Sequence, residues 1–540
     1  MAQEYLCIGI DIGGTNTDAI LLAGKQIIAT IKTNTTPDIT QGVAIAINHL
    51  LQTSHLTAGE IDVVVIGTTH FVNTVLQAKG LNEVLVIRLA KPATTVIEPL
   101  ADWPANLQAA VGDNCEVIGG GYEYNGKEIA PLDCERLKEL ASLAQAKLIK
   151  AAAITGVFAN VNPAQENAAY EILNNLLPEM QISLSHKIGG LNLLTRENAT
   201  ILNAALSVEF KKFYEGIKSA IIDAELSQAK IFFSSNDGTL EEPRDIFPIA
   251  TYGSGPSNSM RGAAALAEVT AAIVADIGGT STDVGILKNS FPLEAGYEIK
   301  IGNAEENVTC NFSAPLTRSC ALGGGSKILV DANNEIKVGP ESVGYQLNKE
   351  AIIFGGKTLT VTDIAVAKGR LKLGNPAFLK TINPLIIDKA DEFIHAKLIE
   401  MVDLILPFAK SSHPLPLILV GGGAYLFDQQ LLLKFLAGKI ARIIVPEHAG
   451  NANALGAAIA KISACYSGVF QYSDTSDCAG ISREKAIEIA KQQAVKAALA
   501  KGADPHTVKL QEIEEMPINY LPGNQTRLRI KVIGENRGDK

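Results

Sequence analysis

The chain has 540 residues, enough for several domains that each bury a core of their own. Its apolar content of 47% with 19% charged residues is ordinary for a compact soluble protein. The formal net charge of −10 argues against nucleic acid or an anionic membrane as the main partner.

The cysteines and the apolar runs indicate a cytoplasmic protein. The seven cysteines are scattered and form no C-x-x-C pair, which favours reduced thiols over a disulfide framework or a zinc site. We expect no signal peptide, because Gly13 and Gly14 arrive before an apolar helix could form. The longest apolar runs, such as 415–420, are too short to span a bilayer.

One octapeptide occurs twice, at 11–18 and at 276–283, and the copies differ only at Asn16 and Ser281. Each copy lies between two short apolar runs, a pattern that predicts strand, tight turn and strand. A glycine pair permits positive φ and close approach to a ligand, and its N–H groups can form an anion site with the threonine hydroxyls. Two such hairpins suggest two like domains that hold one phosphate chain between them. The alternative is a pair of glycine-rich turns whose Asp and Thr residues only cap them.

The next strand leads to a candidate substrate site. Residues 61–66 form a predicted buried strand that ends at Gly67, where polar side chains would face the ligand crevice of an open α/β sheet. The candidates for substrate binding are Thr68, Thr69, His70 and Asn73. A lone histidine beside a strand end is more often structural, and this alternative stays open for His70.

Strand-like and helical runs alternate over 84–190, which is typical of parallel strands with covering helices. A long amphipathic helix follows, with Thr195 as the expected N-cap and an end near Ile222. We expect this helix to connect the two halves of the chain.

Two helices rich in small residues are predicted near 258–266 and 453–460. They could pack across each other and carry a domain closure. Ser254 and Gly255, in the loop before the first of them, are further candidates for substrate binding. A buried strand at 415–420 runs into Gly421, Gly422 and Gly423, where a flat ring such as adenine could lie against the backbone.

The chain divides, on these patterns, into units at 1–190, 191–465 and 466–540. The first two each carry one octapeptide. The third contains a helix rich in Ala, Lys and Gln and two extended segments, and we expect it to be a small α+β appendage.

With these motifs in family order, the chain resembles the hydantoinase A/oxoprolinase family, within the actin/sugar-kinase/Hsp70 ATPase superfamily. The residues that carry the resemblance lie at 11–18, 67–80, 253–256, 276–283, 323–326, 361–370 and 421–423. The resemblance implies an α/β fold with two ribonuclease H-like ATPase domains around an interdomain cleft. It also implies ATP-dependent opening of a cyclic amide such as a hydantoin or 5-oxoproline, often with a B-type subunit in an oligomer.

The residues would then divide the work as follows. The phosphates of ATP would be held by Gly13, Gly14, Thr15, Thr17, Gly278, Gly279, Thr280 and Thr282. Asp11 and Asp276 would position Mg²⁺ through water. Asp18 or Asp283 is a candidate base, unless each only braces its own hairpin. A small-molecule kinase of the same fold and a non-enzymatic nucleotide switch are the alternative functions.

Overall fold

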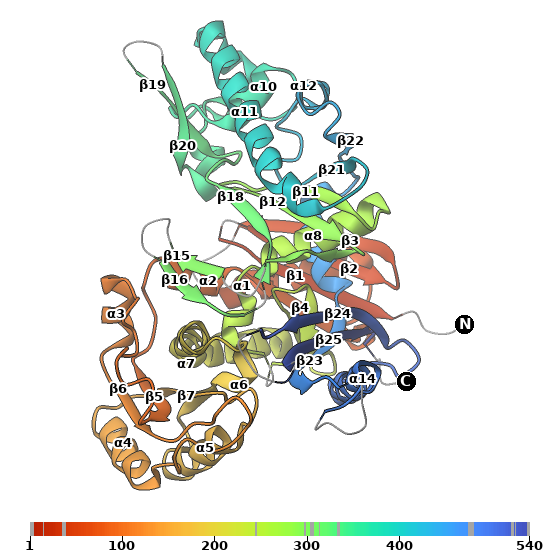
Figure 1. Ribbon diagram of the computed structural model, residues 1–540. Coiled ribbons are helices and arrows are strands. Elements are labelled where there is room, and N and C mark those ends of the chain that lie inside the picture. The colour runs from red at the N-terminus through yellow and green to blue at the C-terminus, as the bar shows by residue number, and fades with distance from the viewer. Residues whose placement is uncertain are drawn as a thin grey trace.

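The computed structural model describes residues 5–14, 16–34, 39–243, 246–295, 299–302, 307–312, 314–331, 335–473, 480–519, 523 and 525–536. Figure 1 shows two main sheet-containing units stacked along the long axis of the molecule, with two further units side by side at the lower end. Strands and helices alternate through most of the chain, so the predicted α/β class is confirmed.

The largest sheet has nine strands and is built from both ends of the chain. In spatial order it contains β24 (Lys509–Pro517), β25 (Gln525–Gly534), β23 (Lys461–Gln471), β10 (Thr239–Glu241), β9 (Lys230–Ser234), β4 (Val63–Thr68), β1 (Leu6–Ile12), β2 (Asn16–Ala23) and β3 (Gln26–Asn34). The first octapeptide spans the antiparallel β1–β2 hairpin, and β4 runs parallel to β1 on its other side.

A second sheet repeats this arrangement. Its strands are β13 (Phe291–Pro292), β12 (Thr282–Lys288), β11 (Ala272–Ile277), β21 (Leu415–Val420) and β22 (Ile440–Ile444), with β18 (Thr317–Cys320) also on β12. The second octapeptide spans the antiparallel β11–β12 hairpin, and β21 runs parallel to β11. The two octapeptides therefore occupy equivalent places in two like sheets, as the sequence predicts.

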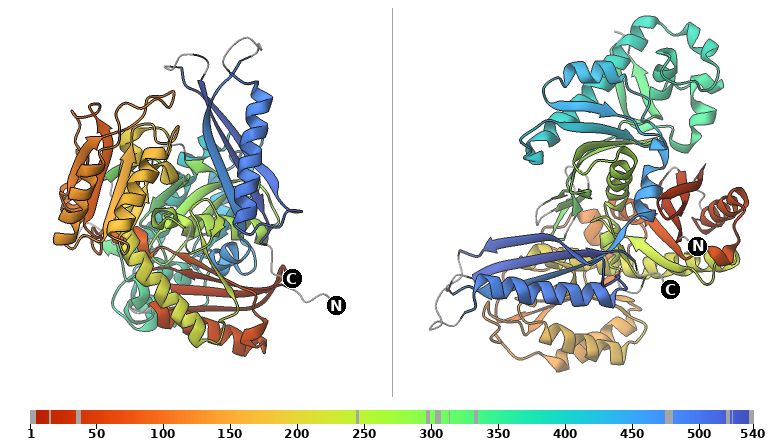
Figure 2. Two further views of the ribbon diagram at one scale, coloured as in Figure 1. Left: turned by 90° about the horizontal axis from the view of Figure 1, so that it is seen from below. Right: turned by 90° about the vertical axis from the view of Figure 1, so that its right-hand side faces the viewer.

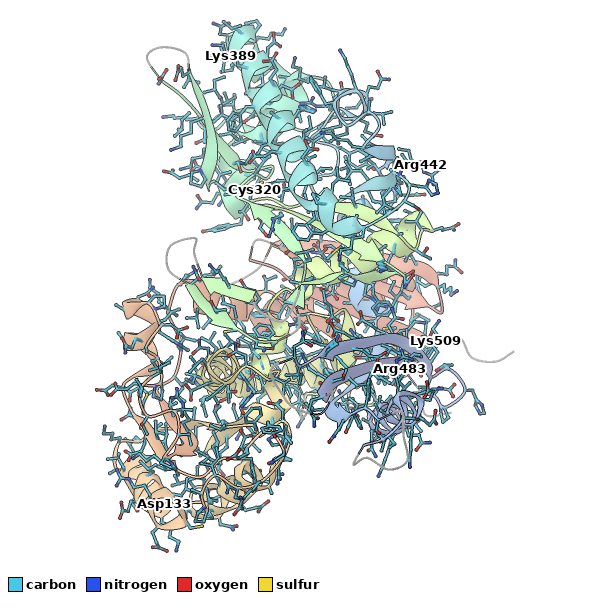
Figure 3. All side chains as sticks on the ribbon, viewed as in Figure 1. Asp133, Cys320, Lys389, Arg442, Arg483 and Lys509 are labelled. Atoms are coloured by element: carbon cyan, nitrogen blue, oxygen red, sulfur yellow. The ribbon has the colours of Figure 1, made fainter. Side chains whose placement is uncertain are left out.

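A third, four-stranded parallel sheet forms a unit of its own, with β6 (Cys115–Gly119), β5 (Val84–Lys91), β7 (Ala151–Gly156) and β8 (Gln181–Leu184) in spatial order. It carries α3 (Ala105–Val111), α4 (Cys134–Ala146), α5 (Ala164–Leu176) and α6 (Ser185–Ile188). Side chains in Figure 3 place Asp133 on this unit and Lys389 and Arg442 at the opposite end of the molecule. Three two-stranded ribbons complete the strands: β14 (Glu294–Ala295) with β17 (Ala314–Pro315), β15 (Ile299–Gly302) with β16 (Asn307–Cys310), and β19 (Ser326–Val330) with β20 (Ile336–Ser342).

The sheets group the chain differently from the predicted boundaries. The expected C-terminal α+β unit is present, with α14 (Arg483–Ala500) against β23 and β25, as Figure 2 shows. Its strands are not separate, however, because β23 also pairs with β10 and so continues the sheet of β1. The boundary predicted at 465 falls inside β23, and the one at 190 falls after a unit inserted between β4 and β9.

The longer helices cover the sheets. They are α1 (Ile39–Ser54), α2 (His70–Leu76), α7 (Leu193–Asp223), α8 (Ser254–Ala267), α10 (Val361–Ala367), α11 (Pro384–Ala409), α12 (Gln429–Phe435) and α13 (Ala452–Ala458). Asn192 caps α7, because its side chain accepts a hydrogen bond from the Thr195 backbone. The prediction of Thr195 as the cap is therefore wrong by one turn. None of the helices in the described residues combines the length and apolar character needed to cross a membrane.

The faces of β1 alternate as a buried strand requires. Ile8 and Ile10 share a core with residues of α1 and α7. Gly9 points the other way, where a Cβ would lie 2.3 Å from the Ala454 carbonyl oxygen on α13. Helix α13 therefore lies directly on the strand that carries the first octapeptide.

The two small-residue helices, α8 and α13, cross with their backbones in direct contact. A Cβ at Gly262 would lie 1.9 Å from the Ala452 carbonyl oxygen, and one at Gly456 would lie 1.8 Å from the Asn258 carbonyl oxygen. No side chain fits at either place. The predicted packing of one helix across the other is confirmed.

This crossing predicts that Gly262→Ala destabilises the protein. The added methyl group meets backbone that cannot rotate away, and overpacking of this kind costs about 1–3 kcal/mol or more. Gly59→Ala is the matched control, because a Cβ there has nothing within 4 Å. Urea unfolding should place Gly262→Ala well below the wild type and Gly59→Ala within error of it. Equal stability of the two variants would contradict the proposed crossing contact.

Candidate active site

Four aspartates from the two octapeptides lie at neighbouring strand ends. Asp11 on β1 is in register with Asp18 on β2, and Asp276 on β11 is in register with Asp283 on β12. The pKa of Asp11 is raised to about 7, mainly by burial and also by the charges of Asp18 and Asp276. Since Asp276 acts on Asp11, the two hairpins meet although they lie far apart in the sequence.

Asn453, at the start of α13, links the two leading aspartates. Its Nδ2 donates a hydrogen bond to Asp11 Oδ2 at 3.2 Å. Burial raises the pKa of Asp276, and hydrogen bonds from Ser259 and Asn453 oppose this rise. Ser259 Oγ, on α8, donates to Asp276 Oδ2 at 2.5 Å. Each of the crossing helices therefore supplies a polar side chain to the aspartates, Ser259 from α8 and Asn453 from α13.

Lys32 is the cation of this cluster. Its Nζ lies 2.6 Å from Asp18 Oδ1 and 2.8 Å from Asp18 Oδ2. Burial raises the pKa of Asp18, and Lys32 opposes this rise. Lys32 comes from β3, directly opposite Asp18 in the sheet. Sequence reasoning missed it because the strand after the hairpin was not assigned, although an alternating run with a lysine follows the octapeptide.

The second hairpin has a neutral donor in the corresponding place. Ser319 on β18 is in register with Asp283, and its Oγ donates a hydrogen bond to Asp283 Oδ1. Burial raises the pKa of Asp283 to about 6, the Ser319 hydrogen bond opposes the rise, and the charge of Asp276 adds to it. Asp18 and Asp283 thus hold equal places in the octapeptide but have different electrostatic surroundings.

Three buried side-chain oxygens in and around the aspartate cluster have no hydrogen-bond partner. They are Asp11 Oδ1, Asn258 Oδ1 and Asn453 Oδ1. A Cβ at Gly67 would lie 2.6 Å from Asn258 Nδ2 and 2.7 Å from Asp11 Oδ1, so these two side chains are neighbours. Carboxylate and amide oxygens suit Mg²⁺. Among the described residues, no group of three or more His, Cys, Asp or Glu side chains could hold a metal ion.

The glycines Gly13 and Gly278 allow tight packing within each turn and do not adopt an unusual backbone conformation. Gly13 N donates to Asn16 O and Gly278 N donates to Ser281 O, which closes each turn. Neither glycine has a positive φ, so that part of the prediction is wrong. A Cβ at Gly13 would lie 3.0 Å from the Asn16 carbonyl oxygen, a contact tighter than side chains normally make.

The remaining predicted phosphate-binding residues differ in exposure. Gly14 and Thr280 are exposed and Gly279 is half-buried. Thr17 and Thr282 are buried, and Thr282 Oγ1 donates its hydrogen to the Leu322 carbonyl. The Thr282 hydroxyl is therefore engaged with the segment after β18, which does not favour a role as a phosphate donor. Thr15 lies outside the described residues.

The glycine-rich turn after β21 packs on the second hairpin. Gly421 has a φ of +85°, and a Cβ there would lie 2.4 Å from Asp276 Oδ1. Gly423 N donates to the Ile277 carbonyl oxygen at 2.8 Å. Gly422 is exposed, and a Cβ there would lie 3.8 Å from Lys32 Cε of the other sheet. The turn therefore borders the aspartate cluster, and its binding of adenine stays a prediction.

The predicted substrate-binding residues fall into two groups. Ser254 Oγ donates to the Thr68 carbonyl oxygen at 3.1 Å, and a Cβ at Gly255 would lie 3.1 Å from Thr69 Cγ2. The end of β4 and the start of α8 are thus brought together. His70 instead stacks on Phe213 at 5.9 Å, and burial lowers its pKa. This favours the structural interpretation of His70. Asn73 lies in α2, and its side chain is outside the described atoms.

Comparison with known proteins identifies two adjoining family regions. Residues 7–177 match the hydantoinase/oxoprolinase N-terminal region, and residues 196–405 match hydantoinase/oxoprolinase. Caprolactamase subunit alpha of Pseudomonas jessenii is 25% identical over 398 residues, which are 69% of this chain and 56% of the relative. The acetophenone carboxylase gamma subunit of Aromatoleum aromaticum is 26% identical over 426 residues, 72% of this chain and 56% of the relative. The chain thus matches little more than half the length of these relatives.

Two solved structures share the fold. The caprolactamase of Pseudomonas jessenii aligns with a TM-score of 0.73 at 18% identity, over 98% of this chain and 88% of that chain. Nucleotide-free acetone carboxylase aligns with a TM-score of 0.69 at 18% identity, over 99% of this chain and 89% of that chain. These likenesses extend through the C-terminal strands and confirm the predicted fold.

The pKa of Asp11 predicts how stability changes with pH. The ordinary value of 3.8 is raised to about 7 on folding, so the folded state binds the proton more tightly. Its contribution to stability is fully present below pH 3.8 and is lost as the pH rises through about 7, a change of about 4 kcal/mol. Asp11→Asn should therefore be more stable than the wild type at pH 8 by urea unfolding.

Asp133→Asn serves as the control for this measurement. Asp133 is exposed and caps α4, where asparagine caps equally well. It should keep the pH dependence of the wild type. A wild-type stability that does not fall between pH 4 and pH 8 relative to Asp11→Asn would contradict the prediction.

Proposed function

The chain belongs to the hydantoinase/oxoprolinase family, and we propose that it is an ATP-dependent enzyme that opens a cyclic amide. In this proposal, ATP phosphorylates the ring amide oxygen, and water then attacks the activated carbon. The substrate class is a hydantoin, 5-oxoproline or another lactam. The similarity to a caprolactamase supports a cyclic amide as the substrate, and the similarity to an acetophenone carboxylase leaves room for another carbonyl compound.

The observation that carries the proposal is the meeting of the two hairpins. Asp11 and Asp276, from two different sheets, share the side chain of Asn453. Bringing a buried and a half-buried carboxylate together raises their pKa values. Perturbed carboxylates that converge from two domains are a mark of a functional site.

The residues around the cluster would divide the work of phosphoryl transfer. The exposed backbone at Gly14, Gly279 and Thr280 would face the phosphates. Lys32 would move from Asp18 to the phosphate oxygens when ATP is bound, since phosphate is the stronger attraction for its ammonium group. Asp11, with the amide oxygens of Asn258 and Asn453, would hold hydrated Mg²⁺, which supplies neutralising charge.

Asp283 is the better candidate for the base. Its pKa of about 6 lets it accept a proton near neutral pH, where a base is most useful. Asp18 instead has a lysine partner that favours its charged, weakly basic form. The Ser319 hydroxyl would orient the Asp283 carboxylate by a hydrogen bond and adds no positive charge beside it.

The subunit names of the relatives support a partner protein. The two relatives are named as the alpha and gamma subunits of their enzymes, and this chain matches 56% of each. We propose a hydantoinase B-type subunit that completes the hydrolytic step, in a hetero-oligomer.

The first test is substrate-stimulated ATP turnover. A panel of hydantoins, 5-oxoproline and lactams is added to the chain with Mg²⁺, with and without a B-type subunit, and both phosphate and ring-opened product are measured. One ring compound should stimulate turnover and yield open product. A phosphorylated product that accumulates without ring opening would instead indicate a kinase, and turnover that responds only to a protein partner would indicate a nucleotide switch.

Substitution of Asp283 tests the assignment of the base. Turnover of the wild type should rise with pH through about 6 as Asp283 loses its proton. Asp283→Asn should lower kcat by about 10²–10⁴-fold and remove this acidic limb. Asp18→Asn should lower activity less and keep the limb. A limb that persists in Asp283→Asn would exclude Asp283 as the base.

Lys32→Met tests the role of the lysine separately. Loss of its ammonium group should raise the KM for ATP by about tenfold or more while kcat changes less, because charge-assisted hydrogen bonds to phosphate contribute about 1.5–3 kcal/mol. Lys25→Met, on the turn at the other end of β2 and β3, is the control and should keep the wild-type KM. An unchanged KM in Lys32→Met would remove Lys32 from the phosphate site.

A further inference from the structure

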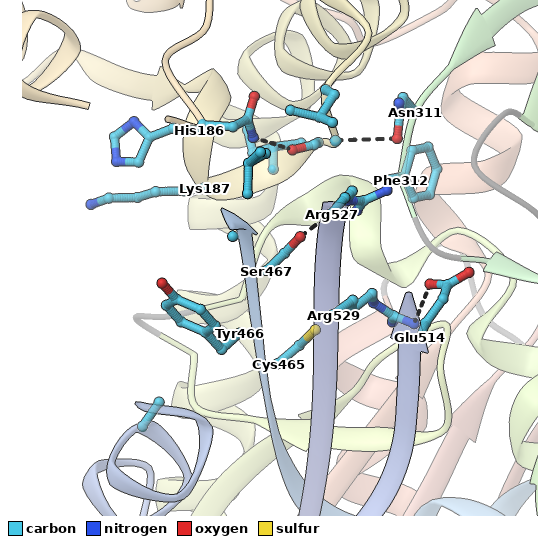
Figure 4. Close-up of a pocket in the computed structure, with 18 of the residues that line it drawn as sticks. His186, Lys187, Asn311, Phe312, Cys465, Tyr466, Ser467, Glu514, Arg527 and Arg529 are labelled. Atoms are coloured by element: carbon cyan, nitrogen blue, oxygen red, sulfur yellow. Dashed lines mark hydrogen bonds and ion pairs between the residues drawn. The ribbon is translucent and has the colours of Figure 1, made fainter. Parts of the chain in front are cut away.

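Two large cavities lie away from the aspartate cluster. One, of about 1120 Å³, separates the four-stranded unit from the C-terminal strands. Figure 4 shows two of its arginines with partners, Arg529 with Glu514 and Arg527 with Ser467. The other, of about 800 Å³, lies beside the crossing of α8 and α13. Among the described residues that line it, Arg261 has a buried guanidinium with no ion-pair partner in that part of the chain.

The smaller cavity lies at the opposite end of the central strands from the aspartates. Cys7 at the start of β1 lines it, whereas Asp11 near the end of β1 belongs to the aspartate cluster. Four residues of strand separate the two, which is about 13 Å. Leu266 and Glu268 at the end of α8 and Ala458 at the end of α13 form the other wall. The cavity is therefore distinct from the site proposed for ATP.

Arg261 of α8 is the buried cation of this cavity. Its side chain is 5% exposed, and its Nη2 donates to the Ile459 carbonyl oxygen at 2.8 Å. Its Nε and Nη1 are buried without a hydrogen-bond partner. The guanidinium also lies over the Phe291 ring, with Cζ 4.6 Å from the ring centroid. A guanidinium held between a ring and one carbonyl leaves donors free for a ligand.

The nearest acids do not neutralise Arg261. Asp237 lies 2.8 Å from Lys531 Nζ, and Glu535 lies 2.5 Å from Lys461 Nζ, so each has a cation of its own. Burial lowers the pKa of Arg261 to about 10, while the charges of Asp237 and Glu535 oppose the fall. The guanidinium therefore stays charged at neutral pH. A buried charge without a hydrogen-bonded counter-ion is costly, and an anionic ligand would remove much of this cost.

The walls of the cavity are mostly apolar. The apolar residues that line it include Ile27, Val63, Val65, Leu240, Ala264, Ala265, Leu266, Leu455, Ala458, Ile459 and Ala460. The other charged residues at the cavity are Lys25 and Glu268, which are exposed and of opposite sign, and the ion pair of Lys461 with Glu535. The interior thus combines one unmatched positive charge with apolar walls, in a volume within the usual range of small-molecule sites.

We propose that this cavity binds a small monocarboxylic acid with an apolar chain, whose carboxylate pairs with Arg261. A single guanidinium matches the one charge of a carboxylate. A phosphate dianion would need several more donors to replace its hydration, and apolar walls do not supply them. The chain of the acid would lie along α8 and α13. This proposal does not depend on the function proposed for the aspartate cluster.

The test is calorimetric titration of the full chain with hexanoate in the absence of ATP. Hexanoate should bind with one-to-one stoichiometry, and hexanamide, which has the same shape without the charge, should bind at least tenfold more weakly. Arg261→Met should weaken hexanoate binding at least tenfold. Lys25→Met, which removes an exposed cation of the same cavity, should leave the Kd within twofold.

Two further arms keep the test decisive. Ala265→Phe places a ring at the cavity wall on an exposed face of α8, so it should fold normally and still weaken hexanoate binding. It replaces Arg261→Met if that variant does not fold. Absence of hexanoate binding, or wild-type affinity in Ala265→Phe, would overturn the proposal. Inorganic phosphate that binds more tightly than hexanoate would also overturn it, in favour of a phosphate ligand.

Discussion

The contact between the backbones of α8 and α13 sets the distance between the two main sheets. Gly262 and Gly456 let each helix touch a carbonyl of the other, and Gly9 lets α13 touch β1. Because no side chain separates these elements, Asn453 at the start of α13 is close enough to bond both leading aspartates. Any larger residue at the crossing would move the two strand ends apart. The acidic cluster is thus a consequence of how closely two helices pack.

The duplicated octapeptide has acquired two different electrostatic surroundings. The residues that face its last aspartate come from strands outside the repeat. They are Lys32 on β3 in the first sheet and Ser319 on β18 in the second. A lysine stabilises the charge of Asp18, whereas a hydroxyl leaves Asp283 with a pKa near neutrality. Two identical carboxyl groups can therefore take different roles in one site. The asymmetry depends on residues that the repeat itself does not contain.

The parts predictable from the sequence were those with a local signal. Both hairpins, the glycine turn at Gly421 and the small-residue helices follow from periodicity and turn chemistry within short windows. Lys32 and Asn453 escaped prediction because their roles arise from strand register and helix crossing, which join distant parts of the chain. His70 was a candidate for substrate binding, and its stacking on Phe213, which no local pattern specifies, argues for a structural role. The same limit applies to β23, whose pairing with β10 no local pattern specifies.

The return of the chain to its first sheet has a consequence for how the protein forms during synthesis. The strands β23 and β25 continue the sheet that begins with β1, and about 450 residues of chain are made between them. Until they arrive, β10 leaves an open edge to which other strands could add. A ribosome-bound nascent chain would therefore carry an incomplete first sheet until β23 and β25 are made, while the four-stranded unit at 84–184 can close at once. Completion of the first sheet thus waits for strands that lie far from β1 in the sequence.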